Sequence, residues 1–234
     1  MNPTPMPLQK IAGFESTAYA TLHGELVWTG EATGIDHPRN LRRRWQPPHI
    51  DCDSQRIKAG AHRALGLIDD LPAKGLLLWL MGRPLPFPLQ LACARFDAIR
   101  VALERDDLPD FAVTARRVLG LGAGLTPSGD DFVGGICFAL AHAPRRAWAA
   151  GLPAVQVDLL ECANHATNVI SAALLGDMIA GASYAPMHEL LAALQTDDAR
   201  EISAAMQRLL RLGASSGADM LAGVLLALTT TDDD

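Results

Sequence analysis

The spacing of apolar residues changes character near the middle of the chain. Between residues 13 and 30, apolar and β-branched residues on both sides of a glycine predict a strand, a turn and a second strand. Residues 56–67 and 75–81 predict two more strands, of which the second is a short, fully apolar run that suits a buried strand. Residues 89–105 and 110–119 have the spacing of helices instead.

Helical spacing dominates the rest of the chain. Alanine and leucine recur at helical intervals over five segments, 129–142, 154–181, 187–195, 198–212 and 217–229. Because strands and helices segregate, we predict an α+β fold, in which a β-rich N-terminal half (an antiparallel sheet or small barrel) precedes an all-α helical C-terminal half. The predicted parts are an arm over 1–12, a β-rich domain over 13–110 and a helical domain over 111–234.

A segment rich in glycine, hydroxyls and acid precedes the helix predicted at 129–142. It reads Gly120-Leu-Gly-Ala-Gly-Leu-Thr-Pro-Ser-Gly-Asp-Asp-Phe132, and Ser128 is predicted to be an N-cap with Asp131 completing a capping box. Part of the segment recurs, since Ser128-Gly-x-Asp-x-x-x-Gly135 is matched by Ser216-Gly-x-Asp-x-x-x-Gly223. The match indicates an internal repeat. Its last glycine predicts either close packing of two helices or a backbone that approaches a ligand.

The two motif starts suggest an anion site. If they are neighbours, their helix N-termini and the hydroxyls at the turns would favour a carboxylate or phosphate. The alternative is two helices that are merely well capped. A nucleotide P-loop is excluded, because Asp130 and Asp131 stand where its lysine and hydroxyl residue belong.

Uncharged polar residues form a stripe on the helix predicted at 154–181. Their spacings of three and four residues place them on one face, either as a buried seam between helices or as the wall of a ligand site. The residues are Asn164, Thr167, Asn168 and Ser171.

Charge is distributed unevenly along the 234 residues. The net charge is −6, but residues 1–117 carry +2 and residues 118–234 carry −8. The only lysines are Lys10, Lys58 and Lys74, so the second half has none. This balance argues against nucleic-acid binding, and the basic run 42–44 is predicted to be a solvated turn rather than a phosphate contact.

Targeting signals and cysteine use predict a cytoplasmic protein without a membrane segment. The N-terminal residues have no signal-peptide pattern, and no uncharged apolar stretch reaches the length of a membrane span. The cysteines form no C-x-x-C pair and are expected to be free thiols in a reducing compartment. They are Cys52, Cys93, Cys137 and Cys162.

The string Gly-x-Gly-Leu-Thr-Pro-Ser-Gly-Asp-Asp-Phe at 122–132 resembles the signature of a bacterial family first catalogued as a domain of unknown function. Its best-described member is the AllH subunit of oxamate carbamoyltransferase, from allantoin catabolism. The resemblance extends to Thr167-x-x-x-Ser171 and to residues 212–223, and it covers about 115–230. Ala123 departs from the family pattern, which usually has proline there.

The resemblance implies a part in carbamoyl transfer between carbamoyl phosphate and a small amide or ureido acid such as oxamate. It also implies partner subunits, and a homo-oligomer is the other assembly considered. Chemistry then predicts roles for residues around a small anionic substrate. Catalytic roles go to Asp130, Ser128 and Ser216, and helix-orienting roles to Asp131 and Asp219. Substrate-binding roles go to Gly122, Gly124, Thr126, Gly129, Thr167, Asn168, Ser171, Ser215 and Gly217.

Two other functions remain open from the sequence. One is a non-catalytic subunit that binds an anion or a partner chain through the same pocket. The other is a magnesium-dependent hydrolase, because Asp130, Asp131 and Asp219 offer the oxygen ligands that Mg²⁺ prefers. Outside that alternative, we assign no metal and no cofactor. Positive potential for an anion must then come from helix N-termini, a bound cation, arginines of the first half or a partner chain. The arginine-bearing segment 36–56 is a candidate for determining substrate specificity.

Overall fold

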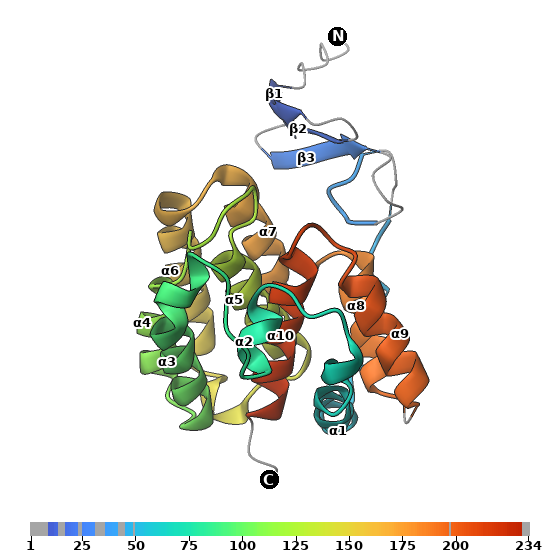
Figure 1. Cartoon of the computed structure of the whole chain (residues 1–234). Helices are drawn as coiled ribbons and strands as arrows, with labels where there is room; N and C mark the ends of the chain where they lie inside the picture. The colour runs from blue at the N-terminus through green and yellow to red at the C-terminus, as the bar shows by residue number, and fades with distance from the viewer. Residues whose placement is uncertain are drawn as a thin grey trace.

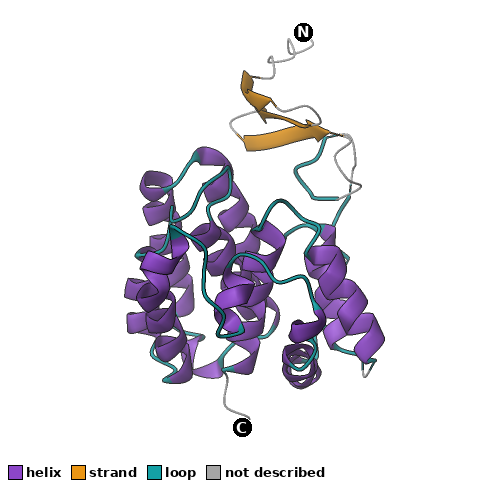
Figure 2. Ribbon diagram, in the orientation of Figure 1, coloured by secondary structure: helices purple, strands orange, loops and turns teal. Residues whose placement is uncertain are grey.

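Helices dominate the computed structural model, which describes residues 9–13, 17–22, 25–30, 36–41, 45–48, 50–196 and 198–230. This part of the chain contains ten α-helices and one small three-stranded sheet (Figure 2). The predicted α+β fold is therefore wrong, because its β-rich N-terminal half is absent from the described residues. The basic run 42–44 lies outside them.

The sheet is an antiparallel meander near the N-terminus. Its strands are β1 (Gln9–Gly13), β2 (Thr17–Leu22) and β3 (Glu25–Gly30), in that order. The predicted strand–turn–strand over 13–30 corresponds to β2 and β3. Residues 9–12 of the predicted arm belong to β1, and the rest of the arm lies outside the described residues. In Figure 1 the sheet lies at one end of the helical body.

Two segments predicted to be strands are helices instead. The first is α1 (Ser54–Leu65), which begins where the Asp53 side chain accepts hydrogen bonds from two backbone N–H groups. Its buried residues Ile57, Ala61 and Ala64 recur at helical spacing, so they form one face of a helix. The second is α2 (Leu76–Leu80), a short and largely buried helix.

Eight more helices complete the body: α3 (Cys93–Glu104), α4 (Leu108–Arg116), α5 (Ser128–His142), α6 (Leu152–Ala166), α7 (Val169–Ile179), α8 (Ala185–Leu194), α9 (Ala199–Leu209) and α10 (Ser216–Thr229). The single helix predicted at 154–181 is wrong. It breaks at Thr167 and Asn168, because the Asn168 side chain accepts hydrogen bonds from Ile170 N–H and Ser171 N–H and starts a new helix. The predicted polar stripe is therefore not on one helix.

The sheet is attached to α7 and to the start of α8. Arg39 follows β3 and forms a two-pronged ion pair with Asp177 of α7. Trp28 of β3, His37 and Tyr184 pack as a group of rings, with centroids 4.6 Å (Trp28–His37) and 4.7 Å (His37–Tyr184) apart. Burial lowers the pKa of His37 to about 3, so this imidazole is neutral at physiological pH.

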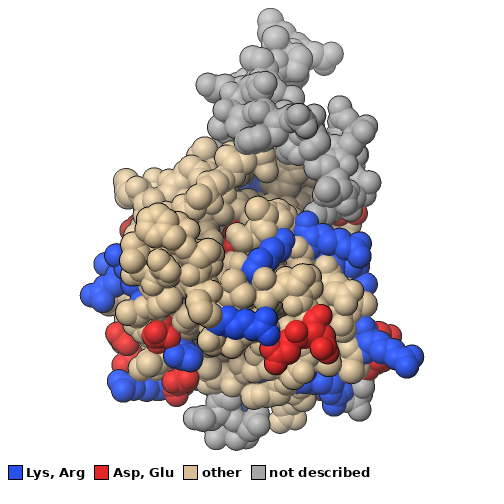
Figure 3. Space-filling model, in the orientation of Figure 1, with Lys and Arg blue, Asp and Glu red and all other residues tan. Residues whose placement is uncertain are grey.

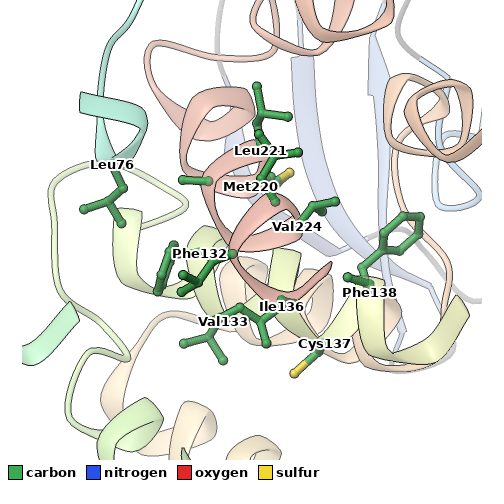
Figure 4. Close-up of a cluster of buried hydrophobic side chains, with 14 of the residues drawn as sticks. Leu76, Phe132, Val133, Ile136, Cys137, Phe138, Met220, Leu221 and Val224 are labelled. Carbon is green, nitrogen blue, oxygen red and sulfur yellow. The ribbon is translucent and has the colours of Figure 1, made fainter. Parts of the chain in front are cut away.

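The centre of the molecule is the contact between α5 and α10. Their apolar side chains lie in the buried cluster of Figure 4, together with Leu76 of α2, and the two backbones touch. A Cβ on Gly135 would lie 2.3 Å from the Met220 carbonyl oxygen, and one on Gly223 would lie 2.1 Å from the Phe132 carbonyl oxygen. Close helix packing thus explains the glycine that ends each motif copy.

The same buried cluster includes residues from both halves of the chain, from Ile57 to Leu228. The β-rich character assigned to 13–110 is wrong, and the domain boundary near residue 110 stays a prediction.

Surface and cysteine features add three observations. No helix in the described part of the chain is long and apolar enough to cross a membrane. The four cysteines are free thiols, as predicted. On the face shown in Figure 3, acidic and basic side chains are interspersed.

Candidate functional site

The two motif copies lie side by side at one end of the helical body. Thr126, just before α5, bonds to Ser216 of α10, and Arg145, just after α5, bonds to Thr230 at the end of α10. The two helices therefore run in the same direction, and their N-termini start together. Thr126 lies just before α5, and Ser216 is the first residue of α10. Their hydroxyl oxygens are 2.8 Å apart and hydrogen-bonded.

The copies exchange hydrogen bonds between hydroxyl and carboxyl groups. Ser128 of α5 interacts with Asp219 of α10, and Ser216 of α10 interacts with Asp131 of α5. The capping box predicted for Ser128 is wrong, because Ser128 is the first helical residue and Pro127 occupies the N-cap without a side-chain hydrogen bond. Each serine thus bonds to the other helix instead of capping its own.

The motif glycines have a packing function that the sequence did not reveal. A Cβ on Gly129 would lie 1.8 Å from the Val118 carbonyl oxygen, and one on Gly217 would lie 1.9 Å from that of Leu209. Their N–H groups donate to the carbonyl oxygens of Leu121 (2.8 Å) and Leu212 (3.0 Å). These two N–H groups are therefore used within the fold, and their substrate-binding role stays a prediction.

Asp130 has protein partners on both carboxylate oxygens. Its Oδ1 accepts a hydrogen bond from Gly120 N–H at 2.6 Å, and its Oδ2 accepts one from the Ser171 hydroxyl at 2.7 Å. The side chain is buried. This geometry suits an anchor that joins the glycine-rich loop, α5 and α7.

Asp131 and Asp219 have spare hydrogen-bonding capacity. Both are buried, and the Oδ2 atom of each has no hydrogen-bond partner among the described residues. Burial and the neighbouring Asp219 charge raise the pKa of Asp131 well above its usual value. Burial also raises the pKa of Asp219 to about 6, although hydrogen bonds to its carboxylate oppose that rise. The Asp219 charge thus acts on Asp131 at the paired helix starts.

Comparison with known proteins identifies the region that contains this arrangement. The sequence model of the family described as oxamate carbamoyltransferase subunit AllH matches residues 118–228. This region, a little under half of the chain, is similar to the AllH family. The similarity suggests a carbamoyltransferase subunit. No curated protein and no solved structure matches the chain.

The AllH region begins with the loop that leads to α5. Gly122, at φ +126°, passes over the helix start so closely that a Cβ would lie 2.6 Å from Ser128 N. Gly124, at φ +100°, faces open space. The Asn168 amide donates to the Leu125 carbonyl oxygen at 2.8 Å and ties the loop to α7. Gly124 thus has room beside it for a ligand.

The other predicted site residues fall into two groups. Ser215 is half-buried and interacts with Asp219, so it belongs to the paired helix starts. Ser171 is buried on Asp130, and Thr167 has a buried hydroxyl with no partner among the described residues. The structure brings the residues of the loop and of the two helix starts together, and their binding roles stay predictions.

Three residues outside the AllH region also form part of this arrangement. Leu76 N–H donates to Asp219 Oδ1 at 2.6 Å, and a Cβ on Gly75 (φ +53°) would lie 2.2 Å from that same oxygen. Lys74 Nζ donates to the Gly213 carbonyl oxygen at 3.3 Å. Their contacts with the second motif could not be predicted from the sequence, because the segment 75–81 was predicted to be a buried strand. The sequence feature that marks this segment is Lys74, the last lysine of the chain, directly followed by Gly75.

Tyr184 connects the sheet to the same place. Its ring packs on His37, and burial raises the pKa of its phenol well above the usual value. The charges of Tyr19, Asp131 and Asp177 contribute to that rise.

The predicted magnesium ligands do not form an open set of oxygens. Asp130 uses both carboxylate oxygens on protein groups, and Asp219 Oδ1 accepts the Leu76 N–H. Among the described residues, no group of three His, Cys, Asp or Glu side chains has the arrangement of a metal site. The donor set therefore gives the hydrolase alternative no support.

Proposed function

We propose that the chain is the AllH-type subunit of an oxamate carbamoyltransferase, and that its paired helix starts bind an anionic substrate. The observation that carries the proposal is that α5 and α10 start together inside the matched region. Thr126 and Ser216 are half-buried, so their hydroxyls are within reach of a ligand that approaches this end of the body.

The proposed reaction transfers the carbamoyl group of carbamoyl phosphate to the amide nitrogen of oxamate. A C–N bond forms, the C–O bond to phosphate breaks, and the nitrogen loses a proton. Hydroxyls of Thr126 and Ser216 would donate hydrogen bonds to a carboxylate, a phosphate or the developing oxyanion. Asp131, whose Oδ2 has no hydrogen-bond partner among the described residues, would accept the proton.

Asp130 has a different role in this proposal. Since both of its oxygens are occupied by Gly120 N–H and the Ser171 hydroxyl, we assign it to positioning the loop rather than to proton transfer. Ser128 is likewise assigned to holding Asp219.

Partner chains are part of the proposal for an electrostatic reason. Residues 118–234 carry a net charge of −8 and no lysine, and the N–H groups of Gly129 and Gly217 are already bonded. An anion bound here needs further positive potential. Residues of the first half and of a partner subunit would supply it.

The test is a carbamoyl-transfer assay on the chain alone and on the chain co-purified with its partner subunits. Thr126→Val and Ser216→Ala each remove one hydroxyl from the paired helix starts. The matched control is Thr229→Val, because Thr229 is also half-buried but lies at the opposite end of α10 and bonds only to Leu225 O. We expect the two site variants to lower kcat/KM roughly 10- to 100-fold, and the control to leave it unchanged.

Two results would contradict the proposal. One is the absence of transfer from carbamoyl phosphate to oxamate in the complete assembly of the unsubstituted chain. The other is full activity of folded Thr126→Val and Ser216→Ala assemblies, which would place the reaction elsewhere and favour a non-catalytic, partner-binding subunit.

A further inference from the structure

Lys74 lies against the paired helix starts although it comes from the other half of the chain. Its Nζ atom donates to the Gly213 carbonyl oxygen at 3.3 Å. Gly213 directly adjoins the second motif, since a Cβ on it would lie 3.0 Å from Ser216 Oγ. The ammonium group is therefore held on the loop that leads into α10.

The backbone beside Lys74 is fixed by two close contacts. Leu76 N–H donates to Asp219 Oδ1 at 2.6 Å, and Gly75 at φ +53° leaves no space for a side chain against that oxygen. Three consecutive residues, 74–76, thus contact the segment 213–219 of the second motif. Such a junction positions the lysine stem relative to Ser216 and Asp219.

Lys74 is a source of the positive charge that an anion bound at the paired helix starts needs. One N–H of its ammonium group is used on a backbone carbonyl oxygen, and the side chain is only half-buried. An ammonium group has three donors, so others are available to a ligand. Its charge also acts on Asp219, whose pKa it lowers.

We propose that Lys74 binds the anionic group of the substrate, either the phosphate of carbamoyl phosphate or the carboxylate of its acceptor. This inference rests on the proposed function of the paired helix starts. Together with the Thr126 and Ser216 hydroxyls, the ammonium group forms a set of donors for one anion. Lys74 is then a substrate-binding residue that the first half contributes to the AllH region.

A purely structural role makes a different prediction. In that case Lys74 only covers a carbonyl oxygen in the loop after α9, and an exposed bond of that kind contributes little to stability or to binding. Substrate affinity would then not depend on its charge, which is the readout that separates the two roles.

The experiment measures binding of inorganic phosphate and of oxamate, and the KM of each substrate, in the complete assembly. The variants are Lys74→Met, which removes the charge, and Lys74→Arg, which keeps it. Lys58→Met is the matched control, because Lys58 is also half-buried but lines a cavity with Arg145 and Thr230 at the opposite end of α5 and α10.

We expect Lys74→Met to weaken binding of one anion roughly 10- to 100-fold and to raise the corresponding KM with little change in kcat. Lys74→Arg should recover most of the loss, and Lys58→Met should have no effect. The anion that loses affinity identifies the group that Lys74 contacts.

Unchanged binding and KM for both anions in Lys74→Met would overturn the inference, as would a loss that Lys74→Arg fails to recover. If Lys74→Met lowers the melting temperature, Lys74→Gln tests the charge while it keeps a donor for the Gly213 carbonyl. Failure of this inference is distinct from failure of the proposed function, because the Ser216→Ala assembly would still lose activity if only the lysine assignment were wrong.

Discussion

The two copies of the Ser-Gly-x-Asp motif use their serine, glycines and last aspartate in the same way, and they differ at the third position. In both, the second residue is a glycine that lets the helix start approach an earlier carbonyl oxygen, at residue 118 or 209. In both, the serine bonds to the acid of the other copy, and the last glycine permits the α5–α10 contact. The repeat thus encodes a two-fold related junction.

The copies differ where the first has Asp130 and the second has Ala218. Asp130 joins its own loop to α7, whereas the second copy has no equivalent carboxylate and its Asp219 holds the N-terminus of α2. One copy is therefore stabilised by its immediate surroundings, and the other by a segment from the first half that carries Lys74. The two copies therefore share the α5–α10 contact, although the residues around their helix starts differ.

The largest expected effect comes from breaking what the copies share. Gly135→Ala and Gly223→Ala should each lower the free energy of unfolding by about 2–3 kcal/mol, because a Cβ would lie 2.3 Å or 2.1 Å from a backbone oxygen that cannot move independently. Urea denaturation measures the loss. The double variant should lose less than the sum, since both residues close one contact.

Gly176→Ala is the matched control for these glycines. Gly176 also lies within a helix, but its added Cβ would be 3.5 Å from Leu160 Cδ2, which is an ordinary contact. Alanine there should leave stability unchanged or raise it by up to about 1 kcal/mol. Equal losses at Gly135 and Gly176 would contradict the close crossing of α5 and α10.

The next largest effect is the pH dependence of stability that comes from Asp219 and Asp131, the acids at the two helix starts. The folded-state pKa of Asp219, about 6, lies above its usual value of 3.8, so the folded protein binds this proton more tightly than the unfolded chain does. Stability from this group is therefore present at low pH and is lost as pH rises from about 4 to above 6. Asp219→Asn cannot titrate, and its stability relative to the unsubstituted protein should increase over that range.

Chemical denaturation at several pH values from 4 to 7.5 measures the stability difference between Asp219→Asn and the unsubstituted protein. Asp131→Asn, measured in the same way, tests the second acid. The Asp131 pKa is raised in the same direction, partly by the charge of Asp219. Each single variant should therefore reduce the pH dependence that the other acid contributes. A difference that does not change with pH for either variant would mean that the two carboxyl groups are not in a buried pair.

The comparison also shows what the sequence could predict. The repeat, the motif glycines and the resemblance to the AllH family depend on local residue identity, and they pointed to the right segments. The partners of each acid could not be predicted, because Asp219 bonds to a residue 143 positions earlier. The strand prediction at 75–81 failed because a short apolar run has no period that separates a buried strand from a buried helix. The strand prediction at 56–67 failed although its apolar residues recur at helical spacing.

The smallest expected effect tests the tether that only the first copy has. Ser171→Ala removes the hydroxyl that donates to Asp130 Oδ2 and should lower the free energy of unfolding by about 1–2 kcal/mol, because a buried carboxylate oxygen loses its partner. In a double-mutant cycle with Asp130→Asn, the Ser171→Ala loss should shrink, since the charged acceptor is already gone. Fully additive losses would instead show that Ser171 stabilises α7 independently of Asp130, and the asymmetry between the two copies would then lie in the Gly120 contact alone.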